Sequence, residues 1–287
     1  MKSPILSFFN AEGYEQLMGR WSRRLASSFL EFITINDGDS VLDVGCGTGS
    51  LAHTVADTRP QSRIVGIDPS APAVEYARER TRGGQMQFDV GDAQKLPYPD
   101  SSFDKTLALL VINLIPDARK TMQEMRRVTR PGGGVAAAVW DYGEDMTMFR
   151  TFWDTVVKLD SAAEPHHQRH VPYCRRGELS SLWRETGLVG VLETGLTIPL
   201  DFASFDDYFT PFLKVVGPSG SYLAGLPPER QTVLAQRLRE DSWGLDLTSQ
   251  SPCRPGHGLF REPFRNHRSA VSSKNRVLLS KSGHSRV

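Results

Sequence analysis

The amino-acid sequence predicts an α/β fold in which helices cover both faces of a parallel sheet. Two observations carry this prediction. An apolar run at residues 41–44 leads into a glycine-rich turn and then into a helical pattern, which together make a strand–turn–helix unit. Apolar runs and helical patterns then alternate up to Trp140, as in chains that form parallel sheets through right-handed crossovers.

Length and charge place few limits on function. The 287 residues can form one large domain or two small ones, and the formal net charge is +1. Residues 249–287 hold eight Lys/Arg and one Asp/Glu, so the tail is basic and the rest of the chain is mildly acidic. The cysteines Cys46, Cys174 and Cys253 are too scattered for a disulfide framework or a paired metal site, which favours a reducing compartment.

The sequence contains no recognisable targeting or membrane segment. Residues 1–10 carry too short an apolar run for a signal peptide, and no later stretch is apolar over the length that a membrane span needs. We therefore expect a cytoplasmic protein.

Residues 11–32 predict a helix with an apolar stripe. The stripe recurs at intervals of three and four residues and consists of Tyr14, Leu17, Met18, Trp21, Leu25, Phe29 and Phe32. Arg20 interrupts it, and a guanidinium beside a ligand cleft could hold a carboxylate through forked hydrogen bonds. Residues 36–39 then form a turn before the first strand.

The first strand runs into a turn that contains Gly45, Gly47 and Gly49. Glycines here permit left-handed backbone angles and leave room for a ligand. The spacing is G-x-G-x-G, whereas a dinucleotide fingerprint is G-x-G-x-x-G. Because Asp43 precedes the first glycine, the turn suits a ligand with a cation better than one with a pyrophosphate. A generic strand-to-helix turn is the alternative interpretation.

Acidic residues follow the next two strands. The second strand, residues 63–68, ends in Asp68, about where an α/β site places a carboxylate for ribose hydroxyls. The third strand, residues 86–90, is followed by Asp92, which could accept a hydrogen bond from an exocyclic amine. The alternatives are a helix cap for Asp68 and a turn residue for Asp92.

The fourth strand, residues 103–112, is apolar on both faces, as central parallel strands are. Asp117 can cap the helix that follows, and residues 130–134 end that helix before a fifth strand at residues 135–140. Asn113 is the nearest polar side chain past the tip of the fourth strand and is a candidate to face a substrate.

Beyond Asp141 the sequence predicts a cover over the ligand cleft. Its elements are helices at residues 148–159, 178–187, 206–216 and 228–239 and a strand at residues 189–200. The helix at 206–216 is expected to kink at Pro211. Aromatic residues of the cover predict an apolar acceptor pocket; they are Phe152, Trp153, Tyr208, Phe209 and Phe212.

Four motifs in this order resemble those of the class I S-adenosylmethionine-dependent methyltransferases, in the type-11 or quinone-methyltransferase-like group. They are residues 41–49, 66–70, 91–104 and 130–133. Residues 14–22 also resemble a subgroup of these enzymes. The resemblance covers about residues 11–239. It implies a Rossmann-like class I methyltransferase sheet with a helical cover, and S-adenosyl-L-methionine as the cofactor.

The resemblance also implies which residues hold the cofactor. Gly45 and Gly47 would pack against its methionine part, Asp43 would lie near its ammonium, and Asp68 would bind both ribose hydroxyls. The further positions are Asp92 and the Ala93 amide for the adenine edge, Leu109 or Leu110 for the methionine part, and Tyr14 and Arg20 for closure from the N-terminal side. Arg20 is the candidate for the cofactor carboxylate.

We expect four regions along the chain. They are an N-terminal helical cover (1–35), a cofactor-binding core (36–145), a substrate cover with the remaining sheet strands (146–248) and an irregular, basic, low-complexity tail (249–287). The resemblance implies a further strand near the C-terminus, but within the tail only residues 276–280 could form a short one. Either an altered reading frame after about Leu247 or a natural disordered tail explains this composition.

The sequence identifies no catalytic residue, because in-line methyl transfer from a sulfonium chiefly needs alignment and a dry site. A histidine cluster, His166, His167 and His170, could supply a general base for an oxygen acceptor, and Asn113 is a further candidate. His166 and His170 also have helical metal spacing. A solvated loop is the simpler interpretation of the cluster, and we expect no metal.

These patterns predict direct methyl transfer to a small, partly apolar acceptor. The alternatives are an S-adenosylmethionine-binding protein without turnover, an RNA methyltransferase anchored by the basic tail, and a NAD-dependent reductase. Because the body of the chain is acidic, we expect no nucleic-acid partner. The sequence leaves the acceptor, the methylated atom and the oligomeric state open.

Overall fold

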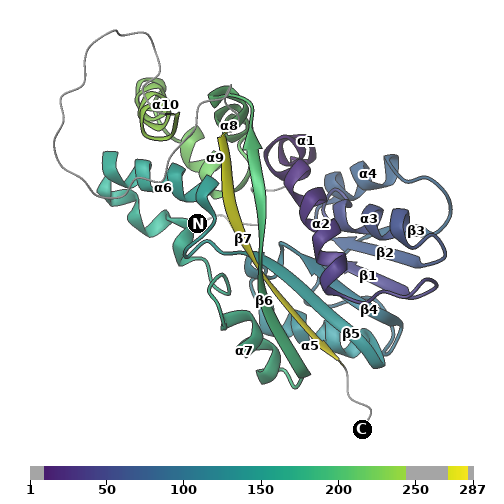
Figure 1. Cartoon of the computed structure of the whole chain (residues 1–287). Coiled ribbons are helices and arrows are strands. Elements are labelled where there is room, and N and C mark those ends of the chain that lie inside the picture. The colour runs from purple at the N-terminus through teal and green to yellow at the C-terminus, as the bar shows by residue number, and fades with distance from the viewer. Residues whose placement is uncertain (1–9, 244–270, 284–287) are drawn as a thin grey trace.

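The computed structural model describes residues 10–243 and 271–283, and these contain a sheet with the strand order β3-β2-β1-β4-β5-β7-β6 (Figure 1). The strands are β1 (Ser40–Val44), β2 (Arg63–Asp68), β3 (Met86–Val90), β4 (Phe103–Leu109), β5 (Thr129–Trp140), β6 (Val189–Phe202) and β7 (Val271–Gly283). Strands β1 to β5 pair in parallel, and β7 runs antiparallel to β5 and β6. The predicted α/β fold is confirmed.

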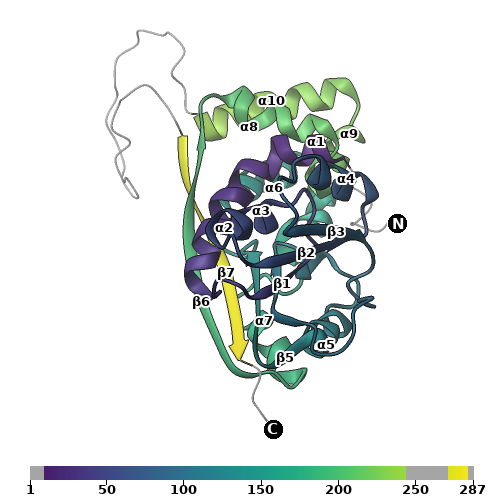
Figure 2. The same ribbon diagram turned by 90° about the vertical axis from the view of Figure 1, so that its right-hand side faces the viewer.

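The strand order reverses between β1 and β4, and this reversal positions the site. Right-handed crossovers along β1, β2 and β3 put α3 (Ser50–Thr58) and α4 (Ala71–Glu79) on one face, whereas the step from β4 to β5 puts α5 (Ala118–Val128) on the other. Figures 1 and 2 show α3 and α4 beside the N-terminal helix α2 (Arg20–Phe32), away from α5. Ligands bind at such a reversal, outside the carboxyl ends of the strands.

Side-chain caps determine where two of these helices begin. The hydroxyl of Ser70 accepts the Ala73 amide at the start of α4, at 3.3 Å. The carboxylate of Asp117 accepts the Lys120 amide at the start of α5, at 2.9 Å, as its predicted role as a cap requires. Both caps satisfy amides that would otherwise lack a partner in the first helical turn.

The N-terminal helix is not continuous. The predicted helix at residues 11–32 consists of α1 (Ala11–Tyr14), a π-helical turn η2 (Glu15–Gly19) and α2. Single π turns inside a helix often occur at functional sites. This one lies where α1 passes the end of the sheet that carries the ligand cleft.

The segments after β5 form the predicted cover. Its helical elements are α6 (Thr147–Leu159), η4 (Ser161–His166), η5 (Gln168–His170), α7 (Glu178–Glu185), α8 (Phe205–Phe209), η6 (Thr210–Lys214), α9 (Gly217–Ala224) and α10 (Pro228–Trp243). In Figure 1, α6, α8, α9 and α10 gather at one end of the sheet and α7 lies at the other. The predicted helix at 206–216 is divided into α8 and η6 next to Pro211, which cannot donate to a helical hydrogen bond.

The prediction of an irregular tail is wrong for Val271–Gly283, which form β7. This strand is longer than the predicted one at 276–280, because it pairs with β6 from Val271 to Gly283 and with β5 from Val277 to Gly283. Two partners satisfy its backbone groups, so a strand can form there without a long apolar run. The rest of the tail lies outside the described residues, and the two explanations for its composition stay predictions.

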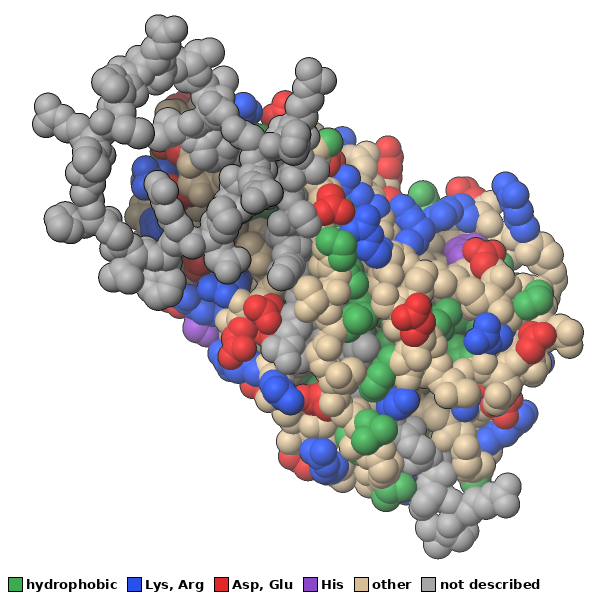
Figure 3. All heavy atoms as spheres, in the orientation of Figure 1, with side chains coloured by type: hydrophobic (Ala, Val, Ile, Leu, Met, Phe, Trp, Pro, Cys, Tyr) green, Lys and Arg blue, Asp and Glu red, His purple; other side chains and the backbone are tan. Residues whose placement is uncertain are grey.

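Basic and acidic side chains are interspersed over the face shown in Figure 3. Many ion pairs are exposed; Arg119 with Glu185 and Arg24 with Asp201 are examples. Such pairs add little to stability because water screens them. No helix in the described part of the chain combines the length and the apolar character that crossing a membrane would need.

Arg127 on α5 holds the loop that follows β3. Its guanidinium donates to the carbonyls of Leu96 and Tyr98 at 3.0 and 2.8 Å and to the carboxylate of Glu124 at 2.8 Å. We expect Arg127→Ala to lower the free energy of unfolding by about 1–3 kcal/mol, because the part-buried carbonyls lose their donor. Urea denaturation measures the change.

The matched control is Arg119→Ala on the same helix. It removes only exposed contacts with Glu185, the ion pair and a long hydrogen bond to the backbone carbonyl, so we expect a change below about 0.5 kcal/mol. Equal losses in the two variants would contradict the structural role of Arg127.

Candidate functional site

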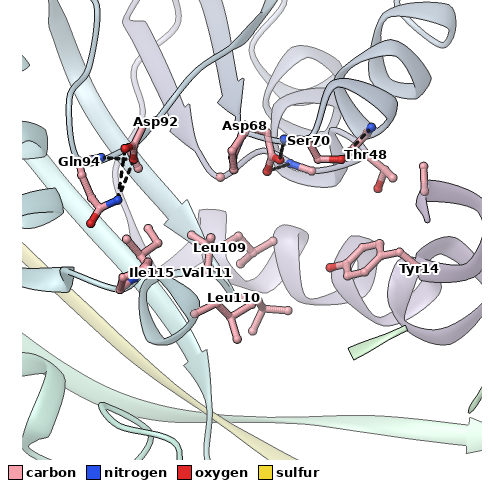
Figure 4. Close-up of a pocket in the computed structure, with 18 residues that line it drawn as sticks. Tyr14, Thr48, Asp68, Ser70, Asp92, Gln94, Leu109, Leu110, Val111 and Ile115 are labelled. Carbon is pink, nitrogen blue, oxygen red and sulfur yellow. Dashed lines mark hydrogen bonds between the residues drawn. The ribbon is translucent and has the colours of Figure 1, made fainter. Parts of the chain in front are cut away.

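A cavity of about 350 Å³ opens outside the carboxyl ends of the parallel strands (Figure 4). Residues that follow β1, β2, β3 and β4 line it together with the N-terminal helix. They are Ala11, Tyr14, Gly45, Gly47, Thr48, Asp68, Pro69, Ser70, Ala73, Asp92, Ala93, Gln94, Leu109, Leu110, Val111, Leu114, Ile115 and Pro116. Figure 4 shows the polar side chains on one side and the leucine, valine and isoleucine side chains on the other, so the cavity is amphipathic.

The glycine turn has left-handed backbone angles, with φ of 70° at Gly45 and 51° at Gly47. A Cβ on Gly45 would lie 2.4 Å from Cγ2 of Val111, so close packing excludes any larger residue. A Cβ on Gly47 would meet nothing within 4 Å. The backbone of Gly47 therefore faces open space in the cavity, where a ligand can approach it closely.

Asp43 does not line the cavity. It is 1% exposed on β1, and its Oδ2 accepts the Ala52 amide of α3 at 3.1 Å, while Oδ1 has no partner. Burial raises the pKa of Asp43 to about 7, partly opposed by the hydrogen bond from Ala52. The expected position beside the cofactor ammonium is thus corrected: the carboxylate contacts the start of α3 because β1 ends in the core, before the turn reaches the cavity.

Asp68 lies on the cavity wall and connects two turns. Its Oδ2 accepts the Gly47 amide at 2.9 Å and its Oδ1 accepts the Ser70 amide at 2.8 Å. Burial raises its pKa, and these two amides oppose the rise. The glycine turn after β1 and the start of α4 are therefore held by one carboxylate.

Asp92 and Gln94 form a second polar contact on the same wall (Figure 4). Oδ1 of Asp92 accepts the backbone amide of Gln94 at 2.8 Å and its side-chain Nε2 at 3.0 Å. Oε1 of Gln94 in turn accepts the Asp117 amide at 3.2 Å. Asp92 is thereby held at the cavity wall, which Ala93 also lines; their role toward an adenine edge stays a prediction.

The apolar wall follows β4 and includes the predicted Leu109. The next residue, Leu110, has a φ of 63°, which costs a residue with a Cβ on the order of 1 kcal/mol or more. Its amide donates to the Ala138 carbonyl at 2.8 Å, which holds this conformation. The chain therefore turns sharply here, and Leu110, Val111 and Leu114 all lie on the wall.

The N-terminal helix closes the cavity from a third side. Tyr14 lines it, as predicted, and its hydroxyl lies 3.0 Å from that of Ser22. Burial raises the pKa of Tyr14 to about 12. Next to it, Glu15 on the π turn accepts the Thr48 hydroxyl at 2.5 Å. This contact ties the N-terminal segment directly to the glycine turn.

Arg20 does not line the cavity, so the expectation that it holds the cofactor carboxylate is corrected. Both terminal nitrogens of its guanidinium donate to Asp207 at 3.1 Å. The guanidinium also lies 4.2 Å from the centre of the Trp21 ring and 5.2 Å from that of Phe202. Arg20 thus links the N-terminal helix to the cover, because its partner Asp207 lies 187 positions later in the chain.

A second cavity of about 40 Å³ adjoins the first, since Tyr14, Leu110 and Leu114 line both. Its other wall residues come from the π turn η2, from the end of β5 and the turn after it, and from the cover. They are Leu17, Met18, Trp140, Tyr142, Phe149, Gln168, Val216, Gly217, Pro218 and Ser219. The wall is mostly apolar. Besides the phenol of Tyr14, its polar side chains are the hydroxyls of Tyr142 and Ser219 and the amide of Gln168.

The aromatic residues expected around the acceptor form the packed interior of the cover instead. The rings of Phe152 and Phe212 stack with their centres 4.8 Å apart, and Trp153 is fully buried. None of the five predicted aromatic residues lines either cavity. Phe149, which lies on α6 together with Phe152 and Trp153, does line the second cavity.

The histidine cluster is not at the site. Nε2 of His167 lies 3.1 Å from Asp154 and its Nδ1 accepts the Arg169 amide at 3.0 Å, while His170 pairs with Glu164. His166 is exposed. None of the three lines a described cavity: His167 is directed to Asp154 on α6, His170 to Glu164, and the ring of His166 lies near that of Tyr222.

Asn113 is also absent from both walls, since the 3₁₀ turn η3 (Ile112–Leu114) directs Leu114 there instead. Among the described residues no group of three or more His, Cys, Asp and Glu is placed to hold a metal.

Sequence reasoning missed Gln94, Tyr142, Gln168 and Ser219. Only Gln94 carried a local signal, because it stands two positions after Asp92.

Residues 35–170 match a sequence family described as a methyltransferase domain. The O-methyltransferase resE of Aspergillus sclerotiorum is 30% identical over 229 residues, which cover 78% of this chain and 79% of that protein. Methyltransferase GfsG of Streptomyces halstedii is 38% identical over 119 residues, which cover 40% of this chain but only 42% of that protein.

A solved structure shares the fold. Phosphoethanolamine N-methyltransferase 2 of Haemonchus contortus, in complex with S-adenosyl-L-methionine, has a TM-score of 0.57 and 16% identity. The match covers 96% of this chain and 57% of that one. At this identity the likeness concerns the fold alone.

The buried carboxyl of Asp43 predicts a pH dependence of stability. Its pKa rises from an ordinary 3.8 to about 7 in the folded protein. Between these values the unfolded chain ionises the group while the folded protein keeps it protonated, so its contribution to the free energy of unfolding falls as pH rises and levels off above about pH 7. We expect Asp43→Asn to remove this fall, which is on the order of 1.4 kcal/mol per pKa unit.

Urea denaturation of wild type and variant at about pH 4.5 and pH 7.5 measures the effect. The variant should lose less stability than the wild type between these two values. The same loss in both proteins would contradict the burial of a protonated carboxyl at this position.

Proposed function

The chain belongs to the S-adenosylmethionine-dependent methyltransferases, and on that premise we propose that it transfers a methyl group from S-adenosyl-L-methionine to a small, partly apolar acceptor by direct in-line displacement. The observation that carries the proposal is the 350 Å³ cavity at the reversal of the strand order, which adjoins a second, mostly apolar cavity across shared wall residues. The larger cavity suits a nucleoside, and the smaller cavity beside it suits the end of another molecule.

The wall residues fit this cofactor. Each carboxylate oxygen of Asp68 accepts one backbone amide, which leaves lone pairs on both oxygens for two ribose hydroxyls. Asp92 keeps a lone pair for the exocyclic amine of adenine, with the Ala93 amide beside it. Gly47 offers bare backbone to the methionine part, and Leu109 offers an apolar contact.

When bound, the cofactor supplies a methyl group that its positively charged sulfur has already activated. The protein then has to align the acceptor and exclude water. Tyr14, Leu110 and Leu114 serve this role, since they line both cavities. Because the pKa of Tyr14 is raised to about 12, its phenol stays neutral near pH 7 and orients a group by hydrogen bonding without acting as a base.

The wall of the second cavity supports a small, partly apolar acceptor. Leu17, Met18, Trp140 and Phe149 provide apolar contacts, and each of these four residues is buried in the folded protein. Mostly apolar walls with a few polar groups are typical of sites for small molecules.

Asp68→Ala tests the cofactor site. Hydrogen bonds to a charged group are worth about 1.5–3 kcal/mol, so we expect the Kd for S-adenosyl-L-homocysteine to rise by at least about tenfold in calorimetry. Circular dichroism must show that the variant is folded, because Asp68 also holds Gly47 and Ser70. Asp100→Asn, whose side chain is 76% exposed, is the control and should bind as the wild type does.

Transfer itself is tested with methyl-labelled cofactor and a cell extract. We expect the label in a small molecule that partitions into organic solvent, because the second cavity is mostly apolar. Unchanged affinity in a folded Asp68→Ala variant, or label recovered in RNA or protein, would contradict the proposed function.

A further inference from the structure

The two acids on the wall of the larger cavity are held in different ways. Asp68 accepts backbone amides from two other positions, Gly47 and Ser70. Asp92 is exposed, and among the residues that the structure describes every hydrogen bond to its carboxylate comes from Gln94. The direction of the Asp92 carboxylate therefore depends on one neighbouring residue.

Gln94 contacts both oxygens of this carboxylate (Figure 4). Its backbone amide donates to Oδ1 of Asp92 at 2.8 Å, and its side-chain Nε2 donates to Oδ1 at 3.0 Å and to Oδ2 at 3.2 Å. The terminal torsion of an aspartate side chain is broadly distributed when nothing restrains it. The backbone amide reaches only one oxygen, so the contact of the side chain with both oxygens is what restricts the rotation of the carboxylate.

The side-chain amide of Gln94 can take only one orientation. A carboxylate accepts hydrogen bonds, so Nε2 must face Asp92. A backbone N–H donates, so Oε1 must face the amide of Asp117, which lies 3.2 Å away. Both partners require the same orientation, and Asp117 caps α5. Gln94 therefore joins the loop after β3 to the start of α5.

The link to Asp117 relates Asp92 to the apolar wall of the cavity. Ile115 and Pro116 line the cavity and directly precede Asp117 in the chain. Asp92 and Gln94 line the same cavity from the loop after β3. An adenine in this cavity would thus meet a carboxylate whose direction is set relative to the apolar surface beside it.

We propose that Gln94 is a positioning residue that directs the Asp92 carboxylate at the exocyclic amine of the cofactor's adenine and so makes the site selective for this base. The inference rests on the proposed function and deepens it. Asp92 makes the contact with the base, and Gln94 sets its direction. Oδ2 of Asp92 accepts only the 3.2 Å contact from Nε2, so this oxygen keeps the larger capacity for a further donor.

Adenine and hypoxanthine differ in what they present to Asp92. The exocyclic amine of adenine donates, whereas hypoxanthine carries a carbonyl oxygen there, which only accepts. Two acceptors that face each other share no proton, and sites reject such a mismatch far more strongly than a small difference in size. A carboxylate that rotates freely can turn away from the oxygen. Strong rejection of hypoxanthine therefore requires that Asp92 be held.

Two ligands separate the orientation of Asp92 from general binding. S-Adenosyl-L-homocysteine carries the amine, and S-inosyl-L-homocysteine carries the oxygen in its place. Calorimetry on the full chain measures the Kd of each ligand, and the ratio of the two values is the selectivity. We expect the wild type to bind S-adenosyl-L-homocysteine at least about tenfold more tightly, since one hydrogen bond contributes roughly 3- to 10-fold and the facing acceptors add a further penalty.

Gln94→Leu removes the donor and keeps the approximate size of the side chain. We expect it to weaken S-adenosyl-L-homocysteine by roughly 3- to 10-fold and S-inosyl-L-homocysteine by no more than about twofold, so the selectivity falls. Gln87→Leu is the matched control. Gln87 is exposed, donates from Nε2 to the Asp89 carboxylate at 2.9 Å and lines neither the larger nor the smaller cavity. This control should keep the selectivity of the wild type.

A double variant shows whether Gln94 acts through Asp92. Asp92→Ala removes the carboxylate, and we expect it to lower the selectivity at least as far as Gln94→Leu does. Adding Gln94→Leu to Asp92→Ala should then change the selectivity by less than about twofold, because no carboxylate is left to be positioned. Losses that multiply in the double variant would contradict the inference.

The outcomes are separable from those of the proposed function. A wild type that binds S-adenosyl-L-homocysteine without preferring it to S-inosyl-L-homocysteine overturns this inference alone. A Gln94→Leu variant that weakens both ligands equally also overturns it, since that pattern indicates lost packing or folding. A wild type that binds neither ligand overturns the proposed function and this inference together.

Discussion

The carboxylate of Asp68 is the constraint on which the site depends. It accepts one amide from the glycine turn after β1 and one from the start of α4, so it fixes the relative position of two turns that come from neighbouring strands. Both donors are backbone groups, which no side-chain rotation can withdraw. A buried acceptor whose two oxygens are already oriented in this way loses little freedom when further donors arrive.

The sheet and the cavity at the carboxyl ends of its parallel strands could be predicted from the sequence because their signals are local. Most of the parallel strands contain an apolar run, and Asp68 and Asp92 stand at or just after the ends of β2 and β3. Parallel strands bring their carboxyl ends to one edge, so residues far apart in the chain meet there without further information. The strand β7 was predicted only in part, because its formation depends on backbone pairing with β5 and β6, which composition does not encode.

The remaining site residues could not be predicted because their positions depend on distant partners. Arg20 turns to Asp207 and away from the cavity, across 187 positions of the chain. Tyr142, Gln168 and Ser219 come from three separate segments and meet only when the cover has packed on the sheet. No spacing rule relates them, whereas the histidines, which do share a local pattern, pair with Asp154 and Glu164 and line neither cavity.

The two cavities are thus formed largely by different parts of the chain, and Leu110 lines both of them. Its strained backbone is held by the Ala138 carbonyl of β5, so the wall between the two cavities is anchored in the sheet. Residues of the cover can therefore change on one side of this wall while Asp68 and the glycine turn keep their geometry on the other. Under the proposed function, such a division would let acceptor recognition vary independently of cofactor binding, since Tyr14, Leu110 and Leu114 are the wall residues that the two cavities share.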